Sequence, residues 1–222
     1  MISIIAGFAA GSIHVFAGPD HLAAVSPLAI QHNRSASRLG LQWGLGHTSG
    51  VILLGGIALI FREMFSLNAI SGYSEKMVGV ILIFIGLWGI KKAATKIIHA
   101  HTHDHNNIEH THFHFHSKVH NEETQKSHNH FHAAFGVGIM HGLAGTSHIF
   151  GILPALAFNS QTDAALYLLF FGIGTIFSMV LFSSFLGFLS QKIELRGTEI
   201  YKKMLIGFSS VSLVIGVYWI FT

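Results

Sequence analysis

Residues 14–21 read His-Val-Phe-Ala-Gly-Pro-Asp-His, and Pro27 follows six residues later. A similar arrangement recurs 127 residues further on as His141, Ala144-Gly145, His148 and Pro154. Histidine is costly inside a lipid bilayer and is usually kept there because function requires it. One copy in each half of the chain therefore predicts a paired intramembrane site, and clustered imidazoles are typical of metal binding.

The composition places this motif in a membrane protein. Half of the 222 residues are hydrophobic, 10% are charged and the mean hydropathy is +0.53. The apolar residues lie in long blocks, as in a polytopic membrane protein. The chain has no cysteine, so its side chains form neither a disulfide nor a thiolate metal site. We expect no signal peptide, because the first apolar run begins at Ile2 without a basic segment before it.

An all-α fold with six transmembrane helices is predicted. Six segments reach the roughly 20 apolar residues that a span needs: Ile2 to Ile30, Leu39 to Phe61, Met77 to Lys96, Ala133 to Phe158, Ala164 to Ser190 and Met204 to Phe221. The first segment is too long for one straight helix, and Gly18-Pro19 at its centre predicts a kink or break. Broken helices in membranes line cavities and often carry the substrate site of transporters.

Basic residues predict the orientation. The loops after the first, third and fifth segments hold Arg34, Arg38, Lys91, Lys92, Lys96, Lys118, Lys126, Lys192, Arg196, Lys202 and Lys203, whereas the other two hold only Arg62 and Lys76. By the positive-inside rule, the former loops are cytoplasmic and both termini lie outside the cell membrane. Residues 1–98 and 133–222 would then be two three-helix repeats of opposite orientation, joined by a cytoplasmic loop over 99–132.

The break decides whether the first motif makes one site or two. On an intact helix His14 and His21 would lie about 10 Å apart, too far to share an ion bound at ~2 Å. Unwinding would gather His14, Asp20 and His21, whereas an intact helix would give two sites or the steps of a relay. His47, among glycines in the second segment, is a third polar element. His141 and His148 have no carboxylate in their copy, so we expect them in the second half of the pathway. The predicted metal ligands are His14, Asp20, His21, His47, His141 and His148.

These motifs resemble the nickel/cobalt transporters of the NiCoT/NicO superfamily. Residues 14–21 are similar to that family's histidine and Asp-His signature, with five intervening residues in place of four, and Leu45-Gly46-His47-Thr48-Ser49 resembles its second signature. Residues 138–145 are similar to the short, urease-accessory-type permeases of the same superfamily. The resemblance implies a secondary permease for Ni²⁺ or Co²⁺, with no prosthetic group. The nitrogen and oxygen ligands suit Zn²⁺ and Fe²⁺ as well.

The loop from His99 to His132 holds twelve histidines. Such a polar, repetitive tract is expected to be disordered without metal and to capture divalent transition metals reversibly. The expected partners are the metal ion and the lipid bilayer, with no nucleic acid. A homo-oligomer and a cytosolic metal acceptor stay open. No Walker-type motif is present, and an enzyme is not expected. Metal efflux in place of uptake, a membrane metalloenzyme and a sensor without flux are the alternatives.

Overall fold

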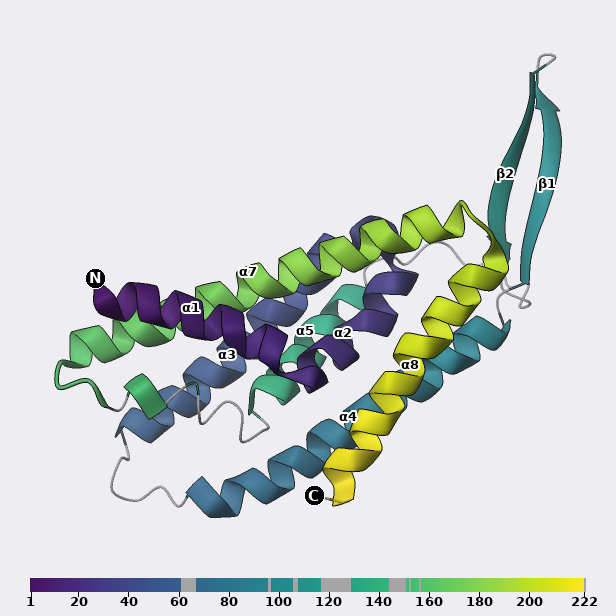
Figure 1. The fold of residues 1–222 in the computed structure, drawn as a ribbon. Helices are drawn as coiled ribbons and strands as arrows, with labels where there is room; N and C mark the ends of the chain where they lie inside the picture. The colour runs from purple at the N-terminus through teal and green to yellow at the C-terminus, as the bar shows by residue number, and fades with distance from the viewer. Residues whose placement is uncertain are drawn as a thin grey trace.

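The computed structural model describes residues 1–60, 67–95, 97–105, 108–116, 129–143, 151, 153–155 and 157–221. Its main elements are α1 (Ile2–Ala17), α2 (Pro19–Gln31), a short 3-10 helix (Asn33–Ser35), α3 (Ala36–Ile60), α4 (Leu67–Thr95), β1 (Ile97–His105), β2 (Ile108–His116), α5 (Asn129–Leu143), α7 (Gln161–Glu194) and α8 (Thr198–Phe221). The helices form an elongated bundle, and the two strands project from one end of it (Figure 1).

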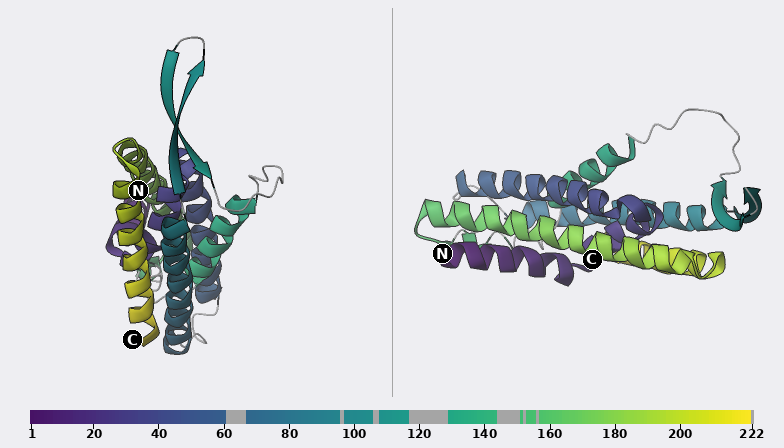
Figure 2. Two further views of the ribbon diagram at one scale, coloured as in Figure 1. Left: turned by 90° about the vertical axis from the view of Figure 1, so that its right-hand side faces the viewer. Right: turned by 90° about the horizontal axis from the view of Figure 1, so that it is seen from above.

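Four closely packed helix pairs build the bundle. α1 lies along α7, α3 packs between α5 and α7, and α4 lies along α8 (Figure 2). α2 is enclosed by α3, α4, α7 and α8, so nine of its thirteen residues are buried. Small residues such as Ala23, Ala24 and Ala29 allow this close packing, and they form the main core with Trp43 and Met179.

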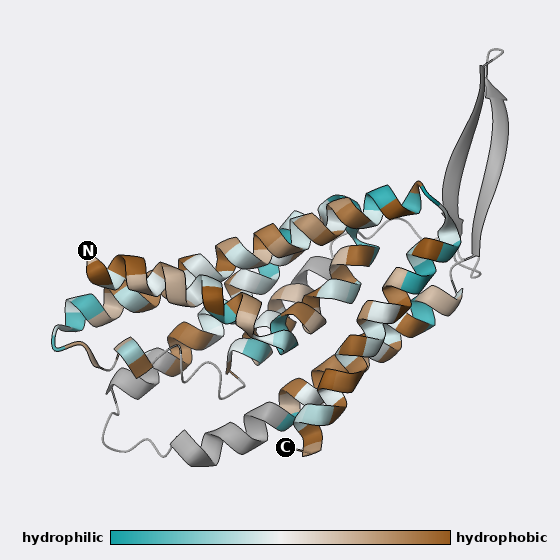
Figure 3. Cartoon of the chain, viewed as in Figure 1, coloured by the Kyte–Doolittle hydropathy of each residue, from teal (hydrophilic) through white to brown (hydrophobic). Residues whose placement is uncertain are grey.

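The bundle exposes apolar side chains and buries polar ones. On α7, large hydrophobic residues face outward, including Phe177, Leu181 and Phe185, and Figure 3 shows hydrophobic residues along all the long helices. The interior holds polar groups instead, among them Asp20, His21, Ser26, His47, Thr48, His141, Thr175, Ser178, Ser183, Ser190, Ser209 and Ser212. Exposed apolar patches of this extent mark a surface that meets lipid. The chain is an integral membrane protein.

The structure contains only some of the six predicted transmembrane spans. In the described residues, three helices are long and apolar enough to cross a membrane, namely 76–95, 161–194 and 198–221, and α1 with α2 makes a fourth if the bent pair is one span. The polar residues Gln42, His47, Thr48 and Ser49 lower the hydropathy of α3. α5 contributes only a shorter apolar helix over 133–143, and residues 144–150 lie outside the described residues. Six spans in a three-plus-three repeat stay a prediction.

The predicted break in the first helix is confirmed. α1 ends at Ala17, α2 begins at Pro19, and the two helices are bent by 70°. Pro19 at the first position of α2 has no N–H to leave unpaired and already has the backbone angle that a helix needs.

The histidine-rich segment includes a hairpin, and the expected disorder without metal over 99–132 stays a prediction. Residues 97–105 and 108–116 pair as an antiparallel hairpin, and the bundle is all-helical as predicted. The physical reason for the hairpin is the alternation of histidine with threonine, phenylalanine and alanine, a period of two that a β-strand matches. Residues 117–128 lie outside the described residues.

Candidate metal centre

Gly18 sets the geometry of the break. Its backbone is extended, with φ −86° and ψ 100°, and it ends α1 and begins α2 at once. Its N–H donates to the His14 carbonyl at 3.0 Å, and its carbonyl accepts from the His21 N–H at 3.2 Å. A Cβ at this position would meet His21 Nδ1, so the tight turn requires glycine. The turn brings the imidazole rings of His14 and His21 to 4.4 Å between centroids, against the roughly 10 Å of an intact helix.

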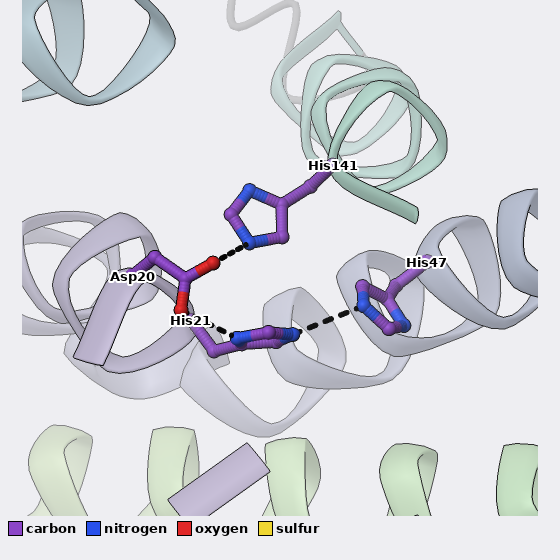
Figure 4. Close-up of polar contacts among 4 residues, drawn as sticks. All are labelled: Asp20, His21, His47 and His141. Atoms are coloured by element: carbon purple, nitrogen blue, oxygen red, sulfur yellow. Dashed lines mark hydrogen bonds and ion pairs between the residues drawn. The ribbon is translucent and has the colours of Figure 1, made fainter. Parts of the chain in front are cut away.

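Asp20 links two histidines from different helices (Figure 4). Its Oδ1 lies 3.0 Å from His21 Nδ1, and its Oδ2 lies 3.0 Å from His141 Nε2 on α5. A carboxylate only accepts hydrogen bonds, so both ring nitrogens act as donors here. Asp20 is 2% exposed. A charge at this depth is tolerated only when it is paired, and both carboxylate oxygens are.

His21 continues the chain of contacts to His47 on α3. Its Nε2 lies 3.1 Å from His47 Nε2, and both side chains are fully buried. Because Nδ1 of His21 donates to Asp20, the lone pair of a neutral His21 imidazole is on Nε2. That nitrogen therefore accepts the hydrogen bond that His47 Nε2–H donates.

The ligand atoms are close enough for two alternative metal sites. His14, His21 and His47 form one group, and Asp20, His21 and His141 form the other, each with ligand atoms within 4.8 Å of one another. Two nitrogens bound to one ion at ~2.0–2.1 Å are roughly 3.0–3.4 Å apart in octahedral or tetrahedral geometry. The 3.1 Å between His21 and His47 already has this value.

Trp43 completes the site and was not among the predicted residues. Its indole stacks on the His47 imidazole with 5.1 Å between centroids and 16° between planes, and it lies 5.2 Å from the His141 ring. It is fully buried, so it keeps water from one side of the cluster. Trp43 and His47 are four residues apart on α3, and that spacing on one helix face was the available signal.

The structure gathers five of the six predicted residues. His14 comes from α1, Asp20 and His21 from the start of α2, His47 from α3 and His141 from α5. His141 lies inside the cluster and contacts Asp20 directly. His148 lies outside the described residues. The break thus brings the predicted side chains together, whereas binding of an ion, and the choice between one site and the steps of a relay, stay predictions.

The fold and this site define a helical membrane protein with a buried His/Asp cluster at a broken helix. Residues 4–218 match the family described as the cytochrome C biogenesis protein transmembrane region, and the chain belongs to that family. It is 29% identical to the urease accessory protein UreH of Bacillus sp. (strain TB-90), over all of this chain and 92% of the relative.

Two plant proteins are also related. The chain is 31% identical to the chloroplast protein FOR GROWTH AND FERTILITY 2 of Arabidopsis thaliana and 29% identical to FOR GROWTH AND FERTILITY 1, over 95% and 89% of its length. It spans about half of each, 54% and 53%. No solved structure matches the chain. The comparisons support a membrane protein of the family that residues 4–218 match, and they do not confirm membership of the NiCoT/NicO superfamily.

Proposed function

We propose that this protein moves a divalent transition-metal ion across the membrane, with Ni²⁺ and Co²⁺ as the first candidates and Zn²⁺ and Fe²⁺ as alternatives. The observation that carries the proposal is the convergence of four imidazoles and one carboxylate at the break between α1 and α2. Ionisable side chains at membrane depth mark ion pathways, and transporters place substrate sites at broken helices. The 29% identity to a urease accessory protein supports a metal-related role.

The contacts favour His14, His21 and His47 as the ligands. His21 Nε2 faces His47 Nε2 at 3.1 Å, and the His14 ring lies 4.4 Å from the His21 ring and 5.6 Å from the His47 ring. The competing group would need His21 to bind through Nδ1, which Asp20 already occupies. An ion between the three imidazoles would replace the His21–His47 contact and leave every other contact of His21 in place.

Asp20 and His141 then support the ligands without binding the ion. A carboxylate on the far nitrogen of a metal-binding histidine fixes the ring and makes it a stronger ligand. Asp20 does this for His21 and is itself held by His141. Its negative charge also offsets part of the charge of a divalent ion inside the membrane. This assignment differs from the prediction that Asp20 is a ligand, because a directly bound Asp20 would add a carboxylate oxygen to the metal shell.

Matching contacts in the two halves support an inverted repeat. Position 14 corresponds to 141, at offset 127, and position 43 to 171, at offset 128. The His14 ring lies 5.3 Å from the Phe171 ring at 42°, and the His141 ring lies 5.2 Å from the Trp43 ring at 50°. The site is thus flanked by equivalent His–aromatic pairs from opposite halves.

Close helix contacts repeat in the same way. A Cβ at Gly11 would meet the Phe171 carbonyl, and one at Gly138 would meet the Trp43 carbonyl. Likewise, Gly46 faces the Phe135 carbonyl and Gly174 faces the Phe8 carbonyl. Each pair is related by the same offsets of 127 and 128. Two repeats of opposite orientation around one site favour transport by alternating access. The predicted cytoplasmic side of the hairpin and the outer position of both termini belong to this proposal.

The family is described as the transmembrane region of a cytochrome C biogenesis protein, which suggests a redox role as the second candidate function. The chain has no cysteine, so its own side chains cannot carry electrons by thiol–disulfide exchange. A metalloenzyme or a sensor would use the same cluster, and both predict metal binding without net ion movement.

Ion flux tests the proposal. We expect purified protein in proteoliposomes to move radiolabelled Ni²⁺, with competition by Co²⁺ and weaker competition by Mn²⁺, and Asp20→Asn to abolish the flux. Asp163→Asn is the matched control, because Asp163 bonds Ser3 at the far end of α7, and it should keep wild-type flux. Absence of flux in the wild type, or equal flux in Asp20→Asn, would contradict the proposal.

A further inference from the structure

Ser178 on α7 carries a fully buried hydroxyl. Its exposure is 0%, and its Oγ has no hydrogen-bond partner among the described residues. A hydroxyl in a membrane helix commonly donates to the carbonyl four residues earlier, as Thr175 does to Phe171 at 2.9 Å. The carbonyl four residues before Ser178 belongs to Gly174, and it accepts from Ser12 Oγ at 3.5 Å. An unpaired polar group in a membrane interior is costly, so this hydroxyl indicates a polar partner that binds beside α7.

The contacts between α1 and α7 place Ser178 beside the metal centre. The two helices lie alongside each other (Figure 2). Their hydrogen bonds join residues that are 160, 162 and 164 positions apart, namely Ser3 with Asp163, Ser12 with Gly174 and Gly11 with Thr175. The same spacing sets Ser178 opposite residues 14–18, which run from His14 to the break at Gly18.

Ser178 also lies on the face of α7 that meets α1. Phe171 contributes the carbonyl that Gly11 approaches, and its ring lies 5.3 Å from the His14 ring. Ser178 follows Phe171 by seven residues, which is two turns further along nearly the same face. α1 ends at Ala17, whereas α7 continues. The hydroxyl therefore faces the end of α1, where the imidazoles converge.

Three imidazole ligands leave room for water on the ion. They fill three of the four positions of a tetrahedral ion and three of the six positions of an octahedral one. A water molecule in an open position is polarised by the ion and donates strong hydrogen bonds. Both oxygens of Asp20 are already paired, and the Phe171 ring beside His14 has no acceptor. A serine hydroxyl can accept such a bond.

We propose, on the basis of the metal site and the transport function proposed above, that Ser178 is a positioning residue of the metal centre. Its hydroxyl accepts a hydrogen bond from a water molecule bound to the ion. That water would satisfy a hydroxyl that has no other partner among the described residues. Ser178 thereby adds α7 to the helices that hold the ion, with an oxygen that acts through water and does not bind the metal itself.

Ser178→Ala tests this role, with Ser183→Ala as the matched control. Ser183 is also fully buried on α7, and its hydroxyl has no partner among the described residues. It lies against Gly40 of α3, which is seven residues, or about 10 Å along the helix, from His47. Both variants are made in the full-length chain in which the twelve histidines from 99 to 132 are threonine, so that the intramembrane cluster is what binds the metal.

Three readouts separate positioning from packing. Ser178→Ala should lower the affinity for Ni²⁺, measured by isothermal titration, by about tenfold, the lower end of the range for groups behind the metal ligands. It should shift the visible absorption bands of bound Co²⁺, which report the geometry around the ion. The thermal stability of the metal-free protein should not fall, because no hydrogen bond of the hydroxyl is lost. Ser183→Ala should leave the Ni²⁺ affinity and the Co²⁺ bands as they are.

The contrary results are distinct. Wild-type Ni²⁺ affinity in Ser178→Ala, or a lower affinity with unchanged Co²⁺ bands, would overturn the role of Ser178 alone. A large loss of stability in metal-free Ser178→Ala would do the same, since it would show a protein partner for the hydroxyl. Absence of Ni²⁺ binding in the parent chain would overturn the proposed ligand set as well. Absence of Ni²⁺ flux, with binding that depends on Ser178, would contradict the transport function and support the role of Ser178.

Discussion

Ser212 on α8 donates a hydrogen bond from its hydroxyl to the carbonyl of Ala23 on α2, at 2.7 Å. Proline at position 27 has no N–H, so the carbonyl four residues before it loses its helical partner, and that carbonyl belongs to Ala23. Ser212 replaces the missing donor from a neighbouring helix. Unpaired backbone groups are costly in a membrane interior and are satisfied in this manner around prolines. The bond secures the buried half-helix that carries Asp20 and His21.

Ser212→Ala should therefore lower the thermal stability of the purified protein. Removing the donor leaves a buried carbonyl unpaired, at a cost of about 1–3 kcal/mol. Ser209→Ala is the control, because Ser209 is buried on the same helix and its hydroxyl has no hydrogen-bond partner among the described residues. In a Pro27→Ala background the helical N–H returns, and Ser212→Ala should then cost less. An equal cost in both backgrounds would refute this role for Ser212.

Gly18→Ala should lower metal affinity by about 10–100-fold, the range for loss of a group that orients a ligand. The added methyl would meet His21 Nδ1 and would lie 2.9 Å from Asp20 Oδ1, so the pair that orients His21 must separate. Gly207→Ala on α8 has open space for a methyl group and serves as the control. Isothermal titration of Ni²⁺ into both variants and the wild type compares them. Wild-type affinity in Gly18→Ala would rule out a tight turn as the basis of the site.

Trp43 should report binding through its fluorescence. Its indole stacks on His47, and paramagnetic Ni²⁺ or Co²⁺ quenches an excited indole at such short range. In a chain with Trp88→Phe and Trp219→Phe, Trp43 is the one tryptophan left, and Ni²⁺ should quench it strongly while Zn²⁺ quenches it less. The same chain with His47→Ala should show a much weaker effect. Unchanged emission at saturating Ni²⁺ would place the ion elsewhere.

The repeated glycine contacts predict matched effects in the two halves. Gly11→Leu and Gly138→Leu should each destabilise the protein by about 1–3 kcal/mol, since each side chain would press on a backbone carbonyl of the facing helix. Gly136→Leu, on the same helix as Gly138, has open space and should change little. Thermal unfolding in detergent gives the comparison. A large loss of stability from only one of Gly11→Leu and Gly138→Leu would argue against equivalent packing roles for the two glycines.

The sequence predicted the local features of the site better than the tertiary ones. The break at Gly18-Pro19 and the approach of His14 to His21 follow from one short segment, because proline limits the backbone whatever surrounds it. Contacts of Trp43 with His141 and of Ser212 with Ala23 join distant segments, and no local pattern specifies which helices meet. The hairpin was missed because a polar repeat predicts disorder, although its period of two also fits strands.

The central claim is that one ion lies between His14, His21 and His47. X-ray absorption at the nickel edge tests it most directly, on Ni²⁺-loaded protein in which the twelve histidines from 99 to 132 are replaced by threonine. For the wild-type cluster we predict scattering from three imidazole nitrogens at ~2.1 Å. His47→Ala should remove one of them. His32→Ala and Asp20→Asn should leave the number of imidazoles unchanged. A nickel shell of oxygen alone, or one that His47→Ala leaves unaltered, would contradict the account.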